Sequence, residues 1–374
     1  MPSAIIRRRI LSLDGGGIRG VISIEVLAAL ERHLRKIEDN PQMVLADWFD
    51  LVAGTSTGAI IATAISLGWS VAEIRSFYLD RGKEMFDHAH WWKLMHNRYQ
   101  GERLKALLRD EFRDEPLGSA RLRTLLMLVM RNVTTDQPWI VTNNPKCRFN
   151  RSERPDSQLN LPLWQLVRAS TAAPSFFPPE TIRVGEHDFV FVDGSISSYT
   201  NPAFLAFLRG TAAPYDVCWP TGEDRLLVVS VGTGTAPHQM EHMCADDYGL
   251  MQAATMVPSS LILSTVLEQD MLCRIFGRCL TGHQLDREIG DLVGASSLGK
   301  EHLFTYLRYN DELSPRALER MGLSDILAEN VQRIDSVKHV PDLIRIGQKI
   351  AEQVLPQHLA AFAGPRFGGE NDKE

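Results

Sequence analysis

The sequence predicts an α/β protein in which a central, mostly parallel β-sheet is covered by helices. Two short apolar runs, each followed by a glycine turn and a helical pattern, occur within the first 70 residues. This repeated strand–loop–helix order is typical of parallel strands connected by helices. The 374 residues show no internal repeat or linker, and 44% of them are hydrophobic and 23% charged. We therefore expect one large globular domain over residues 1–362.

Each of the two strand–loop–helix units near the N-terminus consists of a buried strand, a glycine turn and a helix. In the first unit apolar residues recur at helical spacing, and Asn40-Pro41 ends the helix. In the second unit the helix is apolar on nearly all sides, which predicts that it is buried. The expected strands are 10–13 and 48–53, and the expected helices are 21–37 and 58–67.

The remainder continues the α/β pattern with longer connections. Residues 143–160 are polar and contain prolines, which predicts a loop, and 363–374 are polar and glycine-rich, which predicts a disordered tail. Residues 8–235 carry all the motifs described below, whereas 236–362 form a mainly helical C-terminal part. The further expected helices are 70–86, 102–112 and 161–170, and the further expected strands are 125–133, 139–142, 189–192, 226–231 and 303–309.

Charge and cysteine content restrict the classes of partner. The net charge of −6 gives no basic surface for a nucleic acid polymer. The five cysteines lack Cys-x-x-Cys spacing, which favours a reducing compartment and indicates neither a disulfide framework nor a zinc site. No signal peptide or transmembrane segment is recognisable. We therefore expect a cytoplasmic protein that meets a membrane only from its surface, with the aromatic segment 85–99 as the docking candidate and core packing as its alternative role.

The first candidate site is the glycine loop Gly15-Gly16-Gly17-Ile18-Arg19-Gly20, which matches G-x-G-x-x-G. In a dinucleotide-binding oxidoreductase such glycines admit a pyrophosphate to a helix N-terminus. In an acyl hydrolase the backbone N–H groups of Gly15, Gly16 and Gly17 hold an oxyanion instead. A dinucleotide site also needs an acidic residue about 20 positions further on, at a strand end. Glu38 and Asp39 have that spacing but end a helix, and a purely structural turn is a third interpretation.

The second candidate site is Gly54-Thr55-Ser56-Thr57-Gly58, which matches G-x-S-x-G between a strand and a helix. The flanking glycines permit the sharp turn that lifts a serine hydroxyl out of the sheet. The helix N-terminus behind Ser56 favours negative charge nearby. We therefore predict that Ser56 is a nucleophile, and the alternative is a helix-capping serine in a glycine turn.

A nucleophilic serine needs a base, and the sequence offers an aspartate. None of the histidines occupies an obvious strand end after Ser56, and His238, which follows the strand 226–231, is the best of them. Asp193-Gly194 directly follows the apolar strand 189–192. The reference pKa of an aspartate is about 3.9, and burial at a strand end would raise it towards working pH. Asp193 is therefore the predicted base, with a plain Asp-Gly turn as the alternative.

Taken in order, these motifs resemble the patatin-like phospholipase family, lipid acyl hydrolases that use a Ser–Asp dyad. Ser195 is a departure, because the family usually has glycine or alanine there, but serine is small enough for the same turn. The similar segments are 13–20 (oxyanion loop), 54–58 (nucleophile elbow), 169–179 (a segment before the aspartate), 193–194 (dyad motif) and 229–234 (a later strand).

The resemblance implies a three-layer sandwich related to the α/β hydrolases, with a central sheet between helices. It implies hydrolysis of fatty-acyl esters of phospholipids, with no metal ion and no nucleotide cofactor. Arg19 is expected to anchor the glycine loop, with contact to a lipid phosphate as the alternative. The residues to which the resemblance extends are the dyad Ser56 and Asp193 and the motif glycines Gly20, Gly54, Gly58 and Gly194.

The chain is also similar in size to a bacterial subset of this family, effectors that cyclic nucleotides switch on during antiphage defence. That similarity predicts a cyclic dinucleotide activator, although no residue can be named that would bind it. It also predicts peripheral contact with the inner membrane in the active state. Homo-oligomer formation, and a catalytically silent binding protein with this fold, remain open from the sequence.

Overall fold

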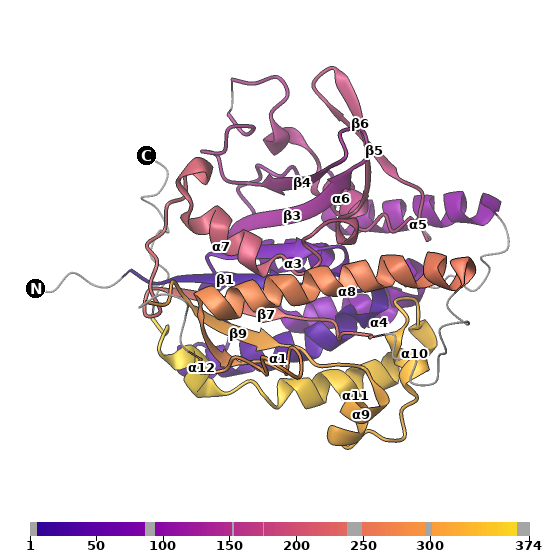
Figure 1. Ribbon diagram of the computed structural model, residues 1–374. Helices are drawn as coiled ribbons and strands as arrows, with labels where there is room; N and C mark the ends of the chain where they lie inside the picture. The colour runs from indigo at the N-terminus through magenta and orange to yellow at the C-terminus, as the bar shows by residue number, and fades with distance from the viewer. Residues whose placement is uncertain are drawn as a thin grey trace, which may run out of the picture.

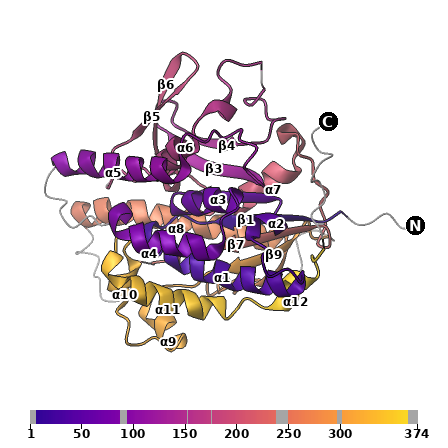
Figure 2. The ribbon, with the colours of Figure 1, turned by 180° about the vertical axis from the view of Figure 1, so that it is seen from behind.

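The computed structural model describes residues 6–86, 94–151, 153–174, 176–237, 249–295 and 301–364. A central sheet separates two layers of helices. Helices α7 and α8 lie in front of the sheet in Figure 1, and helices α1, α3 and α4 lie in front in the reverse view of Figure 2. This arrangement confirms the predicted α/β sandwich.

The sheet is mixed, with its parallel strands at the centre. The strand order is β5-β6-β3-β2-β1-β7-β9-β8, and β4 pairs with β3 outside this path. Strands β4, β5 and β6 are antiparallel to their neighbours, whereas all other pairings are parallel. The strands are β1 (Arg8–Leu13), β2 (Leu51–Thr55), β3 (Leu125–Asn132), β4 (Gln137–Thr142), β5 (Glu180–Val184), β6 (His187–Asp193), β7 (Leu226–Val231), β8 (Arg278–Thr281) and β9 (Thr305–Tyr309).

The sheet divides the hydrophobic core into two clusters. Leu11 and Leu13 of β1 join the larger cluster and Ile10 joins the smaller one, because successive side chains of a strand point to opposite faces. The smaller cluster is covered by α7 (Ala203–Thr211) and α8 (Leu250–Phe276). The larger cluster is covered by α1 (Gly20–Ile37), α2 (Leu45–Trp48), α3 (Thr57–Ser66), α4 (Val71–Phe86), α5 (Leu94–Phe112), α6 (Leu163–Ser170), α9 (Pro315–Arg320), α10 (Ala328–Gln332), α11 (Val340–Ala351) and α12 (Pro356–Ala360).

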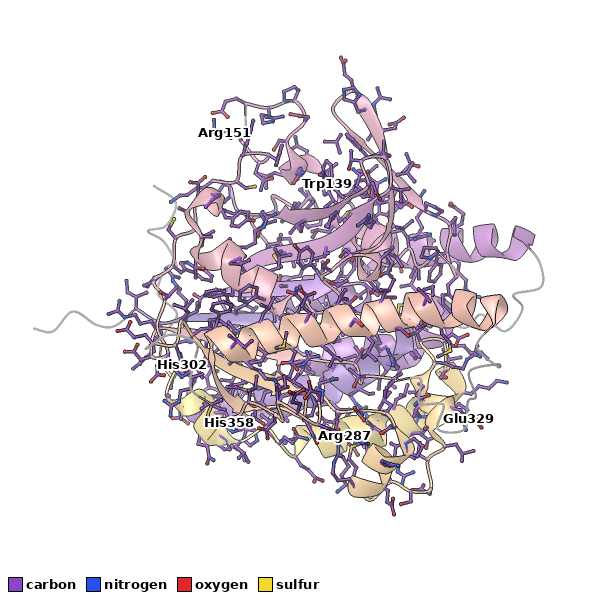
Figure 3. All side chains as sticks on the ribbon, in the orientation of Figure 1. Trp139, Arg151, Arg287, His302, Glu329 and His358 are labelled. Carbon is purple, nitrogen blue, oxygen red and sulfur yellow. The ribbon has the colours of Figure 1, made fainter. Side chains whose placement is uncertain are left out.

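The C-terminal part contributes to both layers. Helix α8 crosses the front of the sheet in Figure 1, whereas α11 packs along α1 on the other face. Helix α12 is held to the sheet by His358, labelled in Figure 3, whose Nδ1 lies 3.0 Å from the hydroxyl of Tyr309 on β9. Of the predicted tail, only Ala363 and Gly364 fall within the described residues.

The structure differs from the sequence prediction mainly at short elements. Trp48 belongs to α2 rather than to a strand, so β2 starts at Leu51. Helix α5 begins at Leu94, earlier than expected. Helix α7 and the short strands β5 and β8 were not predicted. Strand β5 alternates buried and exposed residues directly after a proline segment, so its five residues give little apolar signal.

The sheet register brings the candidate motifs to one edge. Leu13 pairs with Gly54, so the ends of β1 and β2 are neighbours. Asp193, the last residue of β6, pairs with Met130 on β3, which is the next strand beyond β2. Strands β1 and β2 are parallel, so the loops that follow them lie outside the same carboxyl edge, where α/β proteins place their sites. Asp193 of the antiparallel β6 reaches this edge because it pairs near the carboxyl end of β3.

Candidate active site

Ser56 occupies a sharp turn between β2 and α3. Its backbone adopts φ 54° and ψ −123°, a region that non-glycine residues rarely enter. The turn is tight because Gly58 of α3 lies directly against the carbonyl oxygen of Leu13, where a Cβ atom would overlap it. This geometry is that of a nucleophile elbow, which presents the serine hydroxyl above the sheet edge.

Ser170, the last residue of α6, supports the elbow from behind. Its hydroxyl accepts a 2.9 Å hydrogen bond from the backbone N–H of Ser56 and donates one of 2.6 Å to the carbonyl of Val129 on β3. Ser170 is completely buried. The strained Ser56 backbone is therefore tied to the sheet through a single side chain.

The hydroxyl of Ser56 is hydrogen-bonded to Asp193. Ser56 Oγ donates to Asp193 Oδ2 at 2.7 Å, although the two residues are 137 positions apart. The other carboxylate oxygen, Oδ1, accepts a 2.7 Å bond from the N–H of Ser195, and the Asp193 N–H donates to the carbonyl of Ala172. These bonds fix the carboxylate in the plane and direction that a base for Ser56 requires.

Burial and one arginine act in opposite directions on the Asp193 carboxylate. Burial raises the pKa of Asp193, and the hydrogen bonds from Ser195 and Ser56 and the charge of Arg168 oppose that rise. Arg168 is itself buried on α6, where its guanidinium donates to the carbonyl of Pro178 and lies over the ring of Phe177. A carboxyl with a raised pKa is a stronger base than a solvated one.

The glycine loop packs directly on the candidate residues Ser56 and Asp193. A Cβ atom on Gly15 would come within 2.7 Å of Ser195 Oγ and 3.2 Å of Ser56 Cβ, so a side chain there would displace one or both serines. The N–H of Gly15, however, donates to the carbonyl of Thr200 at 3.0 Å. The Gly15 N–H is therefore engaged within the protein. Of the three predicted oxyanion donors, the N–H groups of Gly16 and Gly17 have no hydrogen-bond partner among the described residues and remain the candidates.

The sequence of this chain matches the profile of the family "Patatin-like phospholipase" over residues 11–207, which include Ser56 and Asp193. The chain belongs to the patatin-like phospholipase family. It is 30% identical to Patatin-17 of Solanum cardiophyllum over 246 residues, which are 60% of this chain and 60% of that protein. It is 28% identical to Patatin-01 of Solanum tuberosum over 310 residues, 73% of this chain and 77% of that protein.

Two further similarities carry less information. The chain is 27% identical to "Probable inactive patatin-3-Kuras 1" of Solanum tuberosum, over 73% of this chain and 79% of that protein. The solved structure of VipD from Legionella pneumophila aligns with a TM-score of 0.38 and 12% identity, over 90% of this chain and 66% of that chain. The family assignment rests on the profile match and not on these two.

Arg19 of the family's glycine loop contacts protein carbonyls. Its Nε lies 3.5 Å from the carbonyl oxygen of Gly16, and its NH1 donates to the carbonyl of Gln332 on α10 at 3.2 Å. Burial lowers the pKa of Arg19 to about 10, against the charge of Asp14, so the guanidinium stays protonated at neutral pH. Contacts of this kind are what an anchoring role requires, and the role of Arg19 stays a prediction.

The other motif glycines lie where backbone or side chains approach closely. A Cβ atom on Gly20 would meet Thr57, one on Gly54 would meet the backbone of Gly58, and one on Gly194 would meet Val129. A side chain at any of these three positions would therefore push the loop, the elbow or the aspartate turn away from its neighbour.

Sequence reasoning missed Ser170, Arg168 and Thr233. Ser170 and Arg168 lie in or beside the segment 169–179 that was recognised by resemblance. Ser170 contacts Ser56, 114 positions away, whereas Arg168 donates to Pro178, ten positions away. Thr233 follows β7 and donates from Oγ1 to the carbonyl of Gly15 at 2.8 Å, which holds the glycine loop from a third strand. Its position after a strand end, in Gly232-Thr233-Gly234, was the available signal.

Two further sequence predictions, the alternative base His238 and the docking segment 85–99, lie wholly or partly outside the described residues. His238, the alternative base, is one of the residues that are not described, and no described histidine hydrogen-bonds to Ser56. The docking segment 85–99 falls outside the description from 87 to 93, and no side chains are described from 94 to 99.

Within the described ranges, no group of three or more His, Cys, Asp or Glu side chains is arranged to hold a metal ion. In the same ranges, none of the helices combines the length and apolar character that crossing a membrane requires.

Proposed function

We propose that this chain hydrolyses fatty-acyl esters of phospholipids through a covalent intermediate on Ser56. The observation that carries the proposal is the 2.7 Å hydrogen bond from Ser56 Oγ to Asp193 Oδ2. Family membership supports lipid acyl hydrolysis, but one relative is named "Probable inactive", so the name of the family does not decide activity. The assembled dyad and the strained elbow support an active enzyme.

In the acylation step Asp193 accepts the proton of Ser56 as Oγ attacks the acyl carbonyl carbon. The carbonyl electron pair moves onto its oxygen, and the N–H groups of Gly16 and Gly17 stabilise that oxyanion. One such donor lowers the barrier by about 2.7–4 kcal/mol. The pair then returns, the ester C–O bond breaks, and the lysophospholipid leaves with the proton that Asp193 holds.

In the deacylation step a water molecule attacks the acyl carbon. Asp193 takes one proton from that water, the fatty acid forms, and Ser56 Oγ leaves with the returned proton. Positioned base catalysis of this kind contributes about 10²–10⁴-fold to the rate. The enzyme ends in the state in which it started.

The oxidoreductase alternative has less support. Thr233 and Ile334 already occupy the sides of Gly16 and Gly17 on which a Cβ atom would lie. Glu38, which has the spacing of a ribose-binding acid, accepts hydrogen bonds from Trp48 and from the backbone of Gly364. Glu38 is thus already engaged by groups of the protein, which weighs against a ribose contact, and titration with NAD(P) or FAD tests the alternative directly.

The proposal is tested by measuring fatty acid release from phosphatidylcholine–phosphatidylglycerol vesicles with mass spectrometry. We expect release by the wild type and losses of at least about 10³-fold in Ser56→Ala and Asp193→Asn. Circular dichroism of both variants checks folding. Asp193→Asn with wild-type activity would contradict the dyad, and a folded wild type without release under any added activator would favour a silent binding protein.

We also propose that the protein works from the cytoplasm by peripheral contact with the inner membrane. The substrate resides in a bilayer, and four described cysteines (Cys147, Cys218, Cys273 and Cys279) are free thiols, as in reducing compartments. Sedimentation with vesicles, compared with cell fractionation, tests this placement. A protein recovered with the periplasm or absent from sedimented vesicles contradicts it.

A cyclic dinucleotide activator for antiphage defence is a further proposal, supported by chain size and by the resemblance alone. It predicts that fatty acid release rises at least about tenfold when a cyclic dinucleotide is added to purified protein. Full activity of the purified protein without any nucleotide contradicts this regulation. Size-exclusion chromatography with and without the nucleotide addresses the homo-oligomer in the same samples.

A further inference from the structure

Asp14, the residue directly before the glycine loop, forms a buried ion pair with Arg308 of β9. Arg308 donates from NH1 to Asp14 Oδ1 at 2.9 Å and from NH2 to Oδ2 at 2.6 Å, a two-bond fork. The side chain of Arg308 is 0% exposed and that of Asp14 is 5% exposed. Arg308 lies outside residues 11–207, the range of the family match, so the partner of the loop comes from the C-terminal part.

The guanidinium reaches the loop across an intervening strand. Arg308 pairs in register with Ser230 of β7, and Ser230 pairs with Ser12 of β1, two residues before Asp14. Arg308 NH1 also donates to Ser230 Oγ at 2.7 Å. The side chain is therefore held at its base by β9, along its length by β7 and at its tip by Asp14.

A second acidic residue stands on the other side of Arg308. Asp270 of α8 lies 3.7 Å from Arg308 Nε and is held by a two-bond fork from Arg274, at 2.9 and 2.7 Å, and by the hydroxyl of Tyr306 at 3.1 Å. Burial alone would lower the pKa of Arg308, but the charge and hydrogen bonds of Asp14 raise it. The result is a buried row of alternating charges from α8 to the glycine loop.

We propose that Arg308 is a positioning residue that holds the oxyanion loop against Ser56 through the Asp14 carboxylate. Asp14 immediately precedes Gly15, whose Cα packs on the dyad, and Gly58 of the elbow packs against the carbonyls of Leu13 and Asp14. A shift of Asp14 therefore moves the loop relative to the nucleophile. This inference rests on the proposed function, because it assigns Arg308 to the same catalytic site.

The structure also supplies a matched control. Arg274 is as deeply buried as Arg308 and makes an equivalent fork, but its partners are Asp270 and the carbonyls of His283 and Asp291, and it contacts neither Asp14 nor Arg308. Arg308→Lys and Arg274→Lys each remove one fork in the same buried row. A purely structural role predicts similar effects for both variants.

The experiment measures kcat and KM for a short soluble ester, the rate of Ser56 labelling by a fluorophosphonate, and Tm, for the wild type and both lysine variants. Interactions made only in the transition state affect kcat more than KM. We expect Arg308→Lys to lower kcat and the labelling rate about 10–100-fold with KM within about threefold, because an oxyanion donor is worth about 10²–10³-fold. Arg274→Lys should lower Tm comparably and leave kcat within about threefold.

Equal loss of kcat in the two variants at equal loss of Tm would overturn the proposal. If Arg308→Lys does not fold, Ser230→Ala removes the hydroxyl that accepts from Arg308 NH1 and donates to Asn201 Oδ1 at 3.3 Å. We expect about a two- to fivefold loss of kcat in this variant against an unchanged kcat in Ser66→Ala, another buried serine. An unchanged kcat in Ser230→Ala then overturns it. Wild type that labels at Ser56 but releases no fatty acid contradicts the proposed function alone, whereas wild type that does not label contradicts both.

Discussion

Replacing Ser170 by alanine tests whether the elbow depends on its support from α6. The change leaves the buried N–H of Ser56 without its acceptor, because Ser170 Oγ is the group that receives it at 2.9 Å. A buried donor without a partner costs about 1–3 kcal/mol. With an unfolding entropy of about 2.1 cal/mol/K per residue over 374 residues, we expect Tm to fall by about 1–4 °C.

The same change should reduce catalysis more than stability. Ser56 holds φ 54° only while its surroundings oppose relaxation. A displacement of about 1 Å at reacting atoms costs about 10²-fold, so we expect kcat/KM to fall about 10–100-fold. The assay is ester hydrolysis at several temperatures below both Tm values, together with calorimetry.

Ser66→Ala is the control for this prediction. Ser66 is also buried, and its hydroxyl shares a 2.8 Å hydrogen bond with Thr124, away from the elbow. It should lose a comparable amount of stability and keep kcat/KM within about threefold. A Ser170→Ala enzyme with wild-type kcat/KM and a lowered Tm would refute the reasoning, because Ser170 would then stabilise the fold without shaping the elbow.

Three further changes have distinct signatures. Asp193→Asn should raise the free energy of unfolding at pH 7 by about 1.4 kcal/mol for each unit by which burial raises the folded-state pKa of Asp193. This gain in stability should vanish as the pH falls below the unfolded-state pKa of about 3.9. Chemical denaturation at a series of pH values measures the gain. Arg168→Gln removes a charge that opposes that rise, so the acid limb of kcat/KM should move to higher pH; a limb that moves down or stays contradicts the assignment. Gly58→Ala should lower the free energy of unfolding by about 1–3 kcal/mol and remove most of the activity, because the added methyl group pushes the elbow away from the carbonyl of Leu13. Gly249→Ala is the control, since no described atom lies within 4 Å of an added Cβ there, and it should change neither stability nor activity.

The two motifs that contain Ser56 and Asp193 could be recognised in the sequence because each lies within a few residues of chain. A G-x-S-x-G between a strand and a helix carries its own geometry, and an apolar strand that ends in Asp-Gly carries its own burial. That both meet at 2.7 Å depends on β3, which separates β2 from β6 in the sheet. The sequence indicated a base at a strand end, and the strand order brought it to Ser56.

The parts that sequence reasoning missed are side chains whose partners lie far along the chain. Ser170 reaches Ser56, Thr233 reaches Gly15, and Arg308 reaches Asp14 across 294 positions. Nothing local distinguishes such residues from ordinary buried polar positions, because their roles follow from register and strand order. The hydrogen bond from the Gly15 N–H to the carbonyl of Thr200 likewise could not be predicted from a glycine motif.

The central claim is that Ser56 carries the acyl group during turnover. Acid quenching of the enzyme during hydrolysis of a phospholipid or slow ester, followed by peptide mass spectrometry, measures this directly. We expect an acyl mass on the peptide that contains Ser56 in the wild type, none in Ser56→Ala, and a strongly reduced rate of its formation in Asp193→Asn. Fatty acid release that persists in folded Ser56→Ala, or an acyl mass on another residue, would contradict it.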